Sequence, residues 1–213
     1  MKPRVIDYFP IILNRLDRVC WQPVLKQGND VVDKYFKNWQ LGFGTLLGAV
    51  REKDQYIHHD FDLDIDVIVY PDEEDKIQDF NNEMEDNGFY LIRTQLFDYI
   101  GDELVMSLAY QKNGCIYDIC FFRKFAIDFL HIGKDGIVIR PGDTESRKEL
   151  DVQGVKCYIP ILYDKYLKGR YGNWKIPASK KGQWYDDAKK GKLFIPLDFN
   201  TEIEKKYQDK TNN

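Results

Sequence analysis

The spacing of apolar residues predicts helices that alternate with short strands in the first part of the chain. Apolar faces with helical spacing run from Pro10 to Cys20 and from Asp30 to Lys37. Trp39 to Phe43 is typical of a short strand. The next helix is expected from Thr45 to Arg51, because Thr45 is a good N-cap residue and the positions after it are mostly apolar.

The most regular pattern follows. From Phe61 to Val69 the chain begins by alternating apolar and acidic residues, which predicts a half-buried strand. Pro71 to Asn87 has the pattern of an acidic amphipathic helix that ends at Gly88. The first half of the chain is therefore expected to mix helices and strands in the order α, α, β, α, β, α.

The second half predicts mainly strands. Asn113-Gly114 and Lys134-Asp135-Gly136 are hairpin turn sequences between apolar runs. Strands are expected at 89–94, 104–111, 115–122, 129–132, 137–139 and 155–159, before a helix from Pro160 to Leu167. The fold class is α+β, with one mixed β-sheet and flanking helices. We expect one domain over 1–177, with N-terminal helices (1–38) and a core (39–177), and a basic extension over 178–213.

Composition narrows the class of protein. The chain has 213 residues, 43% of them hydrophobic, a net charge of −4 and a pI near 5.5, so neither a largely disordered chain nor a strongly basic nucleic-acid-binding protein is expected. No apolar stretch approaches the ~20 residues of a membrane span, and no signal peptide is evident. The four cysteines lack the spacing of a metal site, which suggests reduced thiols in a cytoplasmic protein. A location at the inner face of the membrane is the alternative. The oligomeric state is left open.

The acidic strand suggests a metal site. Asp62, Asp64 and Asp66 would project from one face of a strand about 6.6 Å apart, where like charges repel one another. A hard divalent cation held by two of these carboxylates would compensate. The competing interpretation is an exposed face whose acids pair with lysines.

Two features near this strand fit phosphate chemistry. Gly44 and Thr45 lie where a strand gives way to a helix, and amides at a helix start bind anions. Arg51 is a candidate to reach a phosphate oxygen, although a simple surface ion pair explains it equally well. Asp118, in the middle of an apolar strand, is the candidate third carboxylate, and a hydrogen-bonded buried Asp is the alternative.

A phosphate cradle followed by an acidic strand resembles the nucleotidyltransferase superfamily. The segments from Gly44 to Arg51 and from Ile57 to Ile65 look like the signature of the LicD family, which includes fukutin and fukutin-related protein. Tyr171 to Pro177 looks like the closing motif of that family. The similarity spans roughly Trp39 to Pro177. It departs at His58-His59, where the family commonly has Pro-Trp, and in a loop that is one residue longer.

The resemblance implies transfer of phosphocholine, or of ribitol or glycerol phosphate, from a CDP-linked donor to a glycan hydroxyl of lipopolysaccharide, capsule or teichoic acid, with release of CMP. It implies that Asp62 and Asp64 hold Mg²⁺. Asp118 would share a second metal or act as general base. Asp66 is interpreted as lying further from the phosphate cradle than Asp62 and Asp64.

Further substrate-binding candidates are His59, Asp60, Lys168, Tyr171 and Trp174. Tyr171 and Trp174 would form a cation–π cage for choline, or else belong to the aromatic core. Two other functions remain open. One is transfer of NMP from an NTP to a small molecule or protein, and the other is nucleotide binding without turnover.

Overall fold

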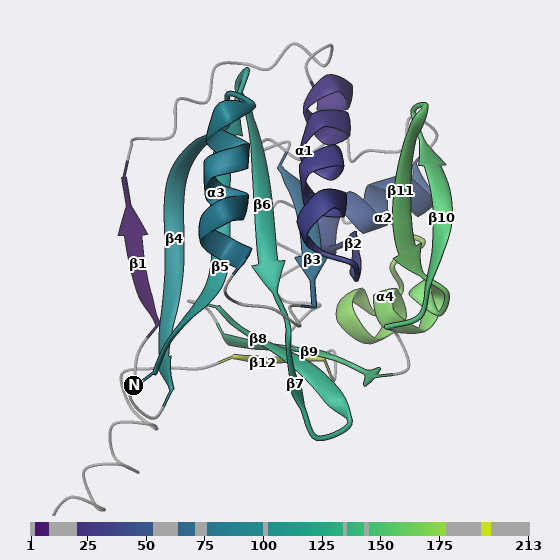
Figure 1. The fold of residues 1–213 in the computed structure, drawn as a ribbon. Helices are drawn as coiled ribbons and strands as arrows, with labels where there is room; N and C mark the ends of the chain where they lie inside the picture. Colours follow the sequence, from purple (N-terminus) through teal and green to yellow (C-terminus); the bar gives the residue numbers. More distant parts are fainter. Residues whose placement is uncertain are drawn as a thin grey trace, which may run out of the picture.

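The structure is a computed structural model that describes residues 3–8, 21–52, 64–70, 76–99, 102–133, 136–142, 145–177 and 193–196. Within these residues the helices are α1 (Trp21–Tyr35), α2 (Phe43–Arg51), α3 (Ile77–Asp86) and α4 (Tyr163–Tyr171). The strands form a mixed main sheet and two smaller antiparallel sheets (Figure 1). The predicted α+β class with flanking helices is confirmed.

The main sheet of the described chain has six strands in the order β1-β4-β5-β6-β3-β2. Their bounds are β1 (Arg4–Asp7), β4 (Tyr90–Tyr99), β5 (Asp102–Lys112), β6 (Cys115–Phe121), β3 (Ile65–Val69) and β2 (Trp39–Leu41). Only β3 and β6 pair in parallel; the other neighbours are antiparallel. The Asn113-Gly114 turn between β5 and β6 is confirmed, with φ of 50° and 79° at these two residues.

The smaller sheets flank the main one. The first contains β12 (Phe194–Pro196), β9 (Gly136–Arg140), β8 (Asp128–Gly133) and β7 (Arg123–Phe125), in that order. The second is the hairpin of β10 (Arg147–Val152) and β11 (Val155–Pro160), which lies beside β2. β12 comes from the predicted C-terminal extension and pairs with β9. The division into domains stays a prediction.

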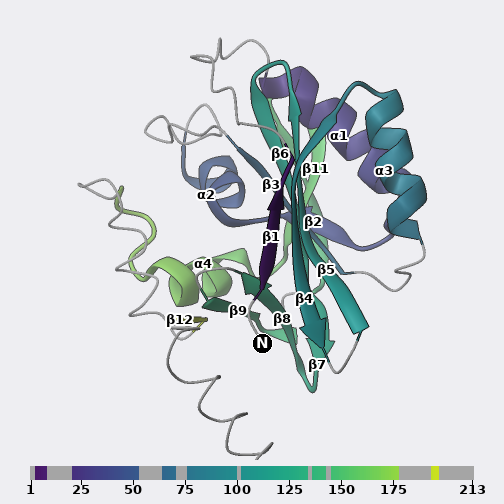
Figure 2. The same ribbon diagram turned by 90° about the vertical axis from the view of Figure 1, so that its left-hand side faces the viewer.

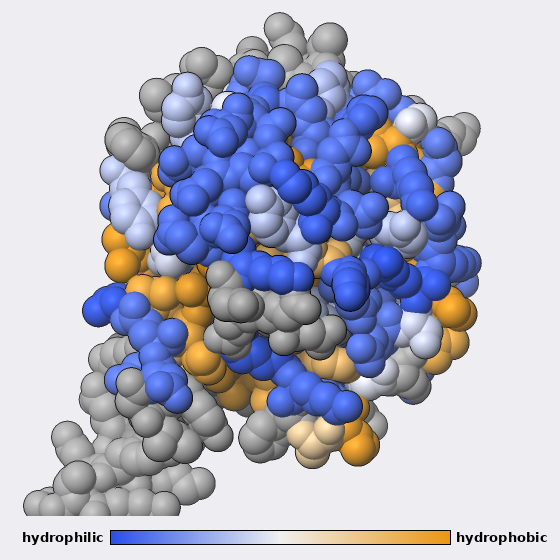
Figure 3. All heavy atoms as spheres, viewed as in Figure 1, coloured by the Kyte–Doolittle hydropathy of each residue, from blue (hydrophilic) through white to orange (hydrophobic). Residues whose placement is uncertain are grey.

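The main sheet is covered differently on its two faces. Helices α1 and α3 lie on one face, and α2 and α4 lie on the other (Figure 2). The main apolar core lies under α1 and α3, where Phe80 packs with Phe36 and Tyr110, and it continues to residues of α2 and α4 such as Leu46 and Leu167. The outer surface of α1 and α3 is mainly hydrophilic (Figure 3). On the opposite face a smaller apolar cluster, including Ile68, Cys120 and Phe129, joins the main sheet to β8.

Two predicted elements are longer or more buried than expected. The helix predicted from Asp30 is already formed at Trp21, the first residue described after the gap over 9–20, and it ends at Tyr35. Gly28 lies in the helix interior, where a Cβ would come within 2.2 Å of the Tyr117 ring, so glycine allows α1 to approach β6 closely.

The prediction of a half-buried strand is wrong for β3. All its residues are buried, because both faces of the sheet are covered there.

Other boundaries shift by a few residues. The acidic helix spans Ile77–Asp86 in the described residues, 71–75 lying outside them, and Gly88 after it adopts a φ of 74°, as expected of a residue that ends a helix. The helix predicted from Pro160 begins at Tyr163. The predicted helix over 10–20 and the start of the acidic strand at 61–63 lie outside the described residues. No helix in the described part of the chain is long and apolar enough to cross a membrane.

Candidate metal and phosphate site

Two carboxylates lie side by side on the α2/α4 face of the sheet. In the parallel pairing of β3 and β6, Asp66 is directly opposite Asp118. Neighbouring strands are about 4.8 Å apart, and paired residues point to the same face. Asp66 is 8% exposed and the Asp118 side chain 14% exposed. Two carboxylates this close and this buried require positive charge nearby or a shared proton.

Asp64 belongs to the same cluster. It lies two residues before Asp66, immediately ahead of β3. Burial is the main cause that raises the pKa of the Cys120 thiol, and the charges of Asp118, Asp66 and Asp64 raise it further. Since all three carboxylates act on one thiol of β6, they gather on the same side of the sheet.

Asp118 has one satisfied oxygen and one unsatisfied oxygen. Its Oδ2 accepts a hydrogen bond from Arg93 Nη2 at 3.0 Å. Its Oδ1 is buried and has no hydrogen-bond partner among the described residues. Burial raises the pKa of the Asp118 carboxyl, and the Arg93 charge opposes that shift without cancelling it. A cation at Oδ1 would satisfy this oxygen and favour the ionised carboxylate.

Helix α2 starts directly against the acidic strand. The Gly42 N–H donates to the Asp66 carbonyl at 2.9 Å. The Thr45 hydroxyl accepts from the Asp66 N–H at 2.8 Å and donates to the Asp64 carbonyl at 3.2 Å. The backbone of Asp66 thus contacts the helix start, while Asp62, with which Asp66 was compared, lies outside the described residues. The assignment of Thr45 as N-cap is wrong, because Gly42 holds that position and Thr45 links the helix to β3.

The first residue of α2 has an unusual backbone. Phe43 has a φ of 39°, in the left-handed region that non-glycine residues rarely adopt, at a cost on the order of 1–3 kcal/mol. Its ring lies 6.2 Å from the Phe122 ring and 5.7 Å from Arg170 Cζ. Gly42 before it has no room for a side chain, because a Cβ would lie 2.7 Å from Ile68. Packing therefore holds the helix start, whose first amides lack intrahelical acceptors.

Buried positive charge lies on the same face. Arg170 of α4 is 5% exposed, and its charge and that of Asp66 both act on the Tyr171 hydroxyl. The pKa of His131 in β8 is lowered to about 4, mainly by burial and in part by the charges of Arg123 and Arg170, against a hydrogen bond with the Phe121 carbonyl. Two guanidiniums, from β7 and α4, thus lie near this imidazole.

Arg51, the predicted phosphate ligand, lies at the other end of α2. The helix is nine residues long, which spans about 13 Å. Arg51 Nε pairs with Glu52 at 2.5 Å, and Nη1 donates to the Trp174 carbonyl at 3.2 Å. In this structure Arg51 therefore ties α2 to the segment after α4 and is not brought to the helix start.

The residues after Arg51 are placed as follows. Trp174 is buried in the main core with its ring edge-on to Tyr163 at 6.3 Å, which fits the alternative of aromatic packing. Tyr171 ends α4, and burial raises the pKa of its hydroxyl. Lys168 is exposed. His59, Asp60 and Asp62 lie outside the described residues, whereas Gly44 and Thr45 are in the first turn of α2.

The residues present fit a hard divalent cation in their chemistry. Carboxylate oxygens are the ligands that Mg²⁺ prefers, and Asp118 Oδ1 is an oxygen that needs a partner. In the described part of the chain, however, no three His, Cys, Asp or Glu side chains are close enough to form a metal site as they stand. A complete site requires Asp62 or a small movement of the three described acids.

No protein-family model matches the chain, and no curated protein matches it. Among solved structures, it is similar to the lincosamide antibiotic adenylyltransferase LnuA bound to lincomycin, with a TM-score of 0.45 at 14% identity over 83% of this chain and 96% of that one. The antibiotic-resistance factor ANT(2'')-Ia in solution gives 0.41 at 14% identity, over 82% and 85% of the two chains. Its complex with adenylyl-2''-tobramycin gives 0.40 at 14%, over 81% and 88%.

Sequence reasoning missed three contributors. Asp66 was set aside because apolar residues follow it, yet the strand register brings it opposite Asp118. Arg93 gave no signal, since its link to Asp118 crosses an intervening strand. Arg170 is buried, but a buried arginine cannot be told from an exposed one in a short basic segment such as Lys168 to Tyr171.

Proposed function

We propose that the chain is a metal-dependent transferase that acts on the phosphate of a nucleotide donor. The observation that carries the proposal is Asp118, whose buried Oδ1 lacks a partner and which lies opposite Asp66 at the start of α2. Asp64, Asp66 and Asp118 would hold Mg²⁺ or Mn²⁺, with Asp62 as a further predicted ligand. A bound Mg²⁺ would neutralise phosphate oxygens and stabilise the leaving group.

The remaining groups would handle the phosphates. The first amides of α2 and the Arg170 guanidinium lie on the acidic face and suit phosphate oxygens. The Thr45 hydroxyl, hydrogen-bonded to both Asp64 and Asp66, keeps the acids and these amides in a fixed relation. An acceptor hydroxyl would attack the phosphorus, and a carboxylate of the cluster would take its proton.

Transfer of NMP from an NTP to a small hydroxyl compound is the first candidate reaction. The charges of Arg123 and Arg170 act on one buried side chain, His131, and the charges of Arg170 and Asp66 act on another, the Tyr171 hydroxyl, so buried guanidiniums lie on the acidic face. A triphosphate brings more negative charge than a diphosphate, so it would bind both guanidiniums. The solved structures with similar folds include an adenylyltransferase with lincomycin and a complex with an adenylylated tobramycin.

Transfer of a phosphorylated alcohol from a CDP-linked donor to a glycan is the second candidate. It is favoured by the contact between Arg51 and the Trp174 carbonyl, which joins the two segments that resemble the LicD signature and closing motif. In this reading Lys168 and Tyr171, with His59 and Asp60, would lie toward the donor alcohol or the acceptor.

The products distinguish the two reactions. The protein is incubated with Mg²⁺ and, separately, ATP, CTP, CDP-choline, CDP-ribitol or CDP-glycerol, with a polyol or oligosaccharide acceptor, and the phosphorus products are followed by ³¹P NMR. Pyrophosphate release supports NMP transfer, and CMP release supports phosphoalcohol transfer. A donor at about 100 times its Kd should also stabilise the fold by about 2.7 kcal/mol in a thermal-shift assay. No shift and no product with any donor would contradict the proposal.

The acidic residues are tested in the same assay. Asp62→Asn, Asp64→Asn and Asp66→Asn remove one charge each and keep the shape of the side chain. If Asp66 completes the site, Asp66→Asn abolishes turnover; if Asp62 does, Asp66→Asn retains it. Asp30→Asn is the matched control, because Asp30 pairs only with Lys26 on the surface of α1, at 2.7 Å.

A further inference from the structure

A row of side chains crosses five strands of the main sheet at the level of the acidic cluster. Pairing partners in successive strands are Asp7 of β1, Arg93 of β4, Ala109 of β5, Asp118 of β6 and Asp66 of β3. Paired residues point to the same face, so the four charged groups of the row share the α2/α4 face. Their signs run from negative to positive to negative, with a methyl group between Arg93 and Asp118.

Arg93 has an acidic partner on each side and pairs with the more distant one. Asp7 is directly opposite Arg93 on the adjacent strand, at the usual spacing of about 5 Å. Asp118 is two strands away, which is about 9.6 Å. Even so, the ion pair in the structure joins Arg93 Nη2 and Asp118 Oδ2 at 3.0 Å, with 28% and 14% of the two side chains exposed.

Ala109 makes this long contact possible. It is fully buried between Arg93 and Asp118 in the row, and its methyl group leaves the space above β5 to the arginine side chain. A larger side chain at Ala109 would stand between the guanidinium and the carboxylate. The arrangement therefore depends on three residues from three strands.

We propose that Arg93 is a positioning residue that holds Asp118 Oδ2 and turns Oδ1 toward the cation, and that Ala109 is small in order to let it do so. The inference rests on the proposed metal-dependent function. Residues that hydrogen-bond to a metal-binding carboxylate orient it, and their loss typically costs 10- to 100-fold in metal affinity or activity. The guanidinium donors lie in a fixed plane, so they fix the direction of the carboxylate as well as its charge.

The test uses the full chain and Mn²⁺ as the probe. Binding is measured by the loss of the free Mn²⁺ signal in electron paramagnetic resonance, next to kcat, KM for the donor and Tm. Arg93→Ala should weaken Mn²⁺ binding about 10- to 100-fold and lower kcat by a similar factor with little change in KM. Arg93→Lys, which keeps the charge and most of the reach, should recover part of both.

Two further variants separate positioning from general stability. Ala109→Leu leaves both charges in place but blocks the path between them, so it should reproduce the Mn²⁺ defect of Arg93→Ala. Asp7→Asn changes the other neighbour of Arg93 in the row and should leave Mn²⁺ binding and kcat at the wild-type level. A lower Tm without a change in Mn²⁺ affinity would mean that the ion pair is only structural.

The outcomes distinguish this inference from the proposed function. Wild-type protein that binds no Mn²⁺ would overturn both. If wild type and Arg93→Ala bind Mn²⁺ equally well, the inference is overturned while the metal-dependent function stands. If Mn²⁺ binding falls in the Arg93 and Ala109 variants but no donor is turned over by wild type, the inference is supported and the donor assignment is wrong.

Discussion

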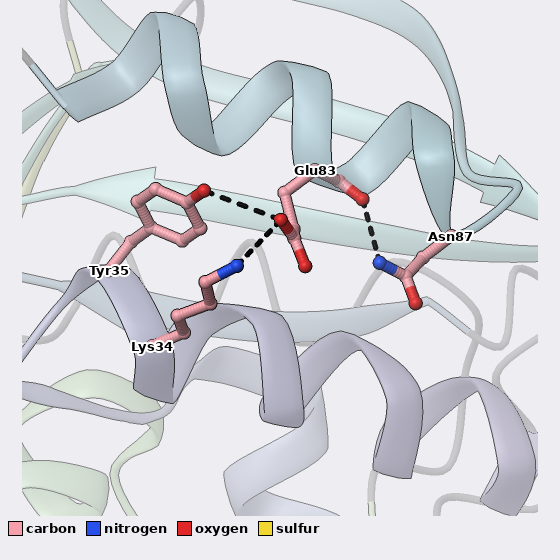
Figure 4. A network of polar contacts seen from close by, with 4 residues as sticks. All are labelled: Lys34, Tyr35, Glu83 and Asn87. Atoms are coloured by element: carbon pink, nitrogen blue, oxygen red, sulfur yellow. Dashed lines mark hydrogen bonds and ion pairs between the residues drawn. The ribbon is translucent and has the colours of Figure 1, made fainter.

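The two faces of the main sheet bury different kinds of side chain. On β6, Tyr117, Ile119 and Phe121 point into the apolar core under α1 and α3. Asp118, between two of them, points the other way and meets Asp66 and Arg93. On the α1/α3 side the buried polar pair is uncharged, with the Tyr117 hydroxyl donating to Asn29 Oδ1 at 2.7 Å, whereas the ion pair of Lys34 and Glu83 lies at the rim (Figure 4).

The difference between the faces supports the proposed function. Burying a charged group costs several kcal/mol unless it is paired, so stability alone would favour apolar residues on both faces. The α2/α4 face nevertheless buries Asp66, Arg140, Arg170 and His131. Perturbed and buried ionisable groups that gather in one place are typical of functional sites. Under the proposed function, one strand would have a stabilising side and a reactive side.

The largest effect is expected at Asp118, whose neighbour on β6, Ile119, points to the opposite face of the sheet. Asp118→Asn should lower turnover by at least roughly 10³-fold, which is about 4 kcal/mol in the activation barrier, because it removes charge from the site. The change in Tm should be small. Single-turnover rates and thermal unfolding of the same preparation check this. A variant that keeps near-normal turnover would remove Asp118 from the site.

The neighbouring core position should show the reverse. Ile119 is fully buried, and Ile119→Ala should destabilise the fold by about 2–5 kcal/mol through lost burial and a cavity. Turnover per folded molecule should stay close to wild type at a temperature well below Tm. Urea unfolding gives the free energy change. A loss of turnover in fully folded Ile119→Ala would mean that the two faces are not independent.

A smaller effect concerns His131 and pH. Its pKa is lowered from 6.5 to about 4 in the folded state, mainly by burial, so the unfolded chain binds the proton first as pH falls. This contribution leaves the free energy of unfolding unaffected above pH 6.5 and lowers it progressively down to pH 4. Between pH 7.5 and pH 5 wild type should lose about 2 kcal/mol from this residue.

His131→Phe should lack that loss and keep the stacking on Phe122, whose ring lies 5.3 Å from the His131 ring. The comparison is made by urea unfolding of both proteins at pH 7.5 and pH 5. Equal pH dependence in the two proteins would show that His131 does not titrate between folded and unfolded states in this range.

The smallest effect is expected at the rim of the apolar face. The hydrogen bond from Lys34 lowers the pKa of Glu83, and the same bond raises the pKa of Lys34. The stability from Glu83 is present above pH 4.5 and is lost as pH falls, but solvent and salt screen an exposed pair. Lys34→Met should therefore change Tm less than any substitution above, and added salt should remove the difference.

Local patterns predicted most elements, because turns and helix ends are determined by residues that are adjacent in the sequence. The Asn113-Gly114 hairpin and the helix stop at Gly88 depend on backbone conformations that these residues adopt easily. The acidic segment also predicted carboxylates next to a helix start, and Thr45 of α2 bonds to the backbone of Asp64 and Asp66; their role in a site stays a prediction. Asp118 was found as an isolated acid in an apolar strand, and the structure places it beside Asp66.

Features that depend on distant pairing were not predictable in this way. Whether Asp66 meets Asp118 is set by the register of two strands that are about 50 residues apart in the sequence. The burial of Asp66 follows from elements on the second face, which the apolar alternation of one strand does not reveal. The same holds for Gly28, whose role depends on the Tyr117 ring approaching it from β6.

The interior position of β6, between β5 and β3, also has a consequence for the rate of amide hydrogen exchange. Its amides are hydrogen-bonded to both neighbours, so they should exchange with deuterated solvent only when most of the domain opens. Asp64 precedes β3 and is not part of that ladder, so its amide can exchange through a local opening. The backbone amides of Asp118 and Asp64 would then differ in protection from exchange by orders of magnitude. Asp118 would lie in the slowest-exchanging part of the molecule and Asp64 at its faster-exchanging edge.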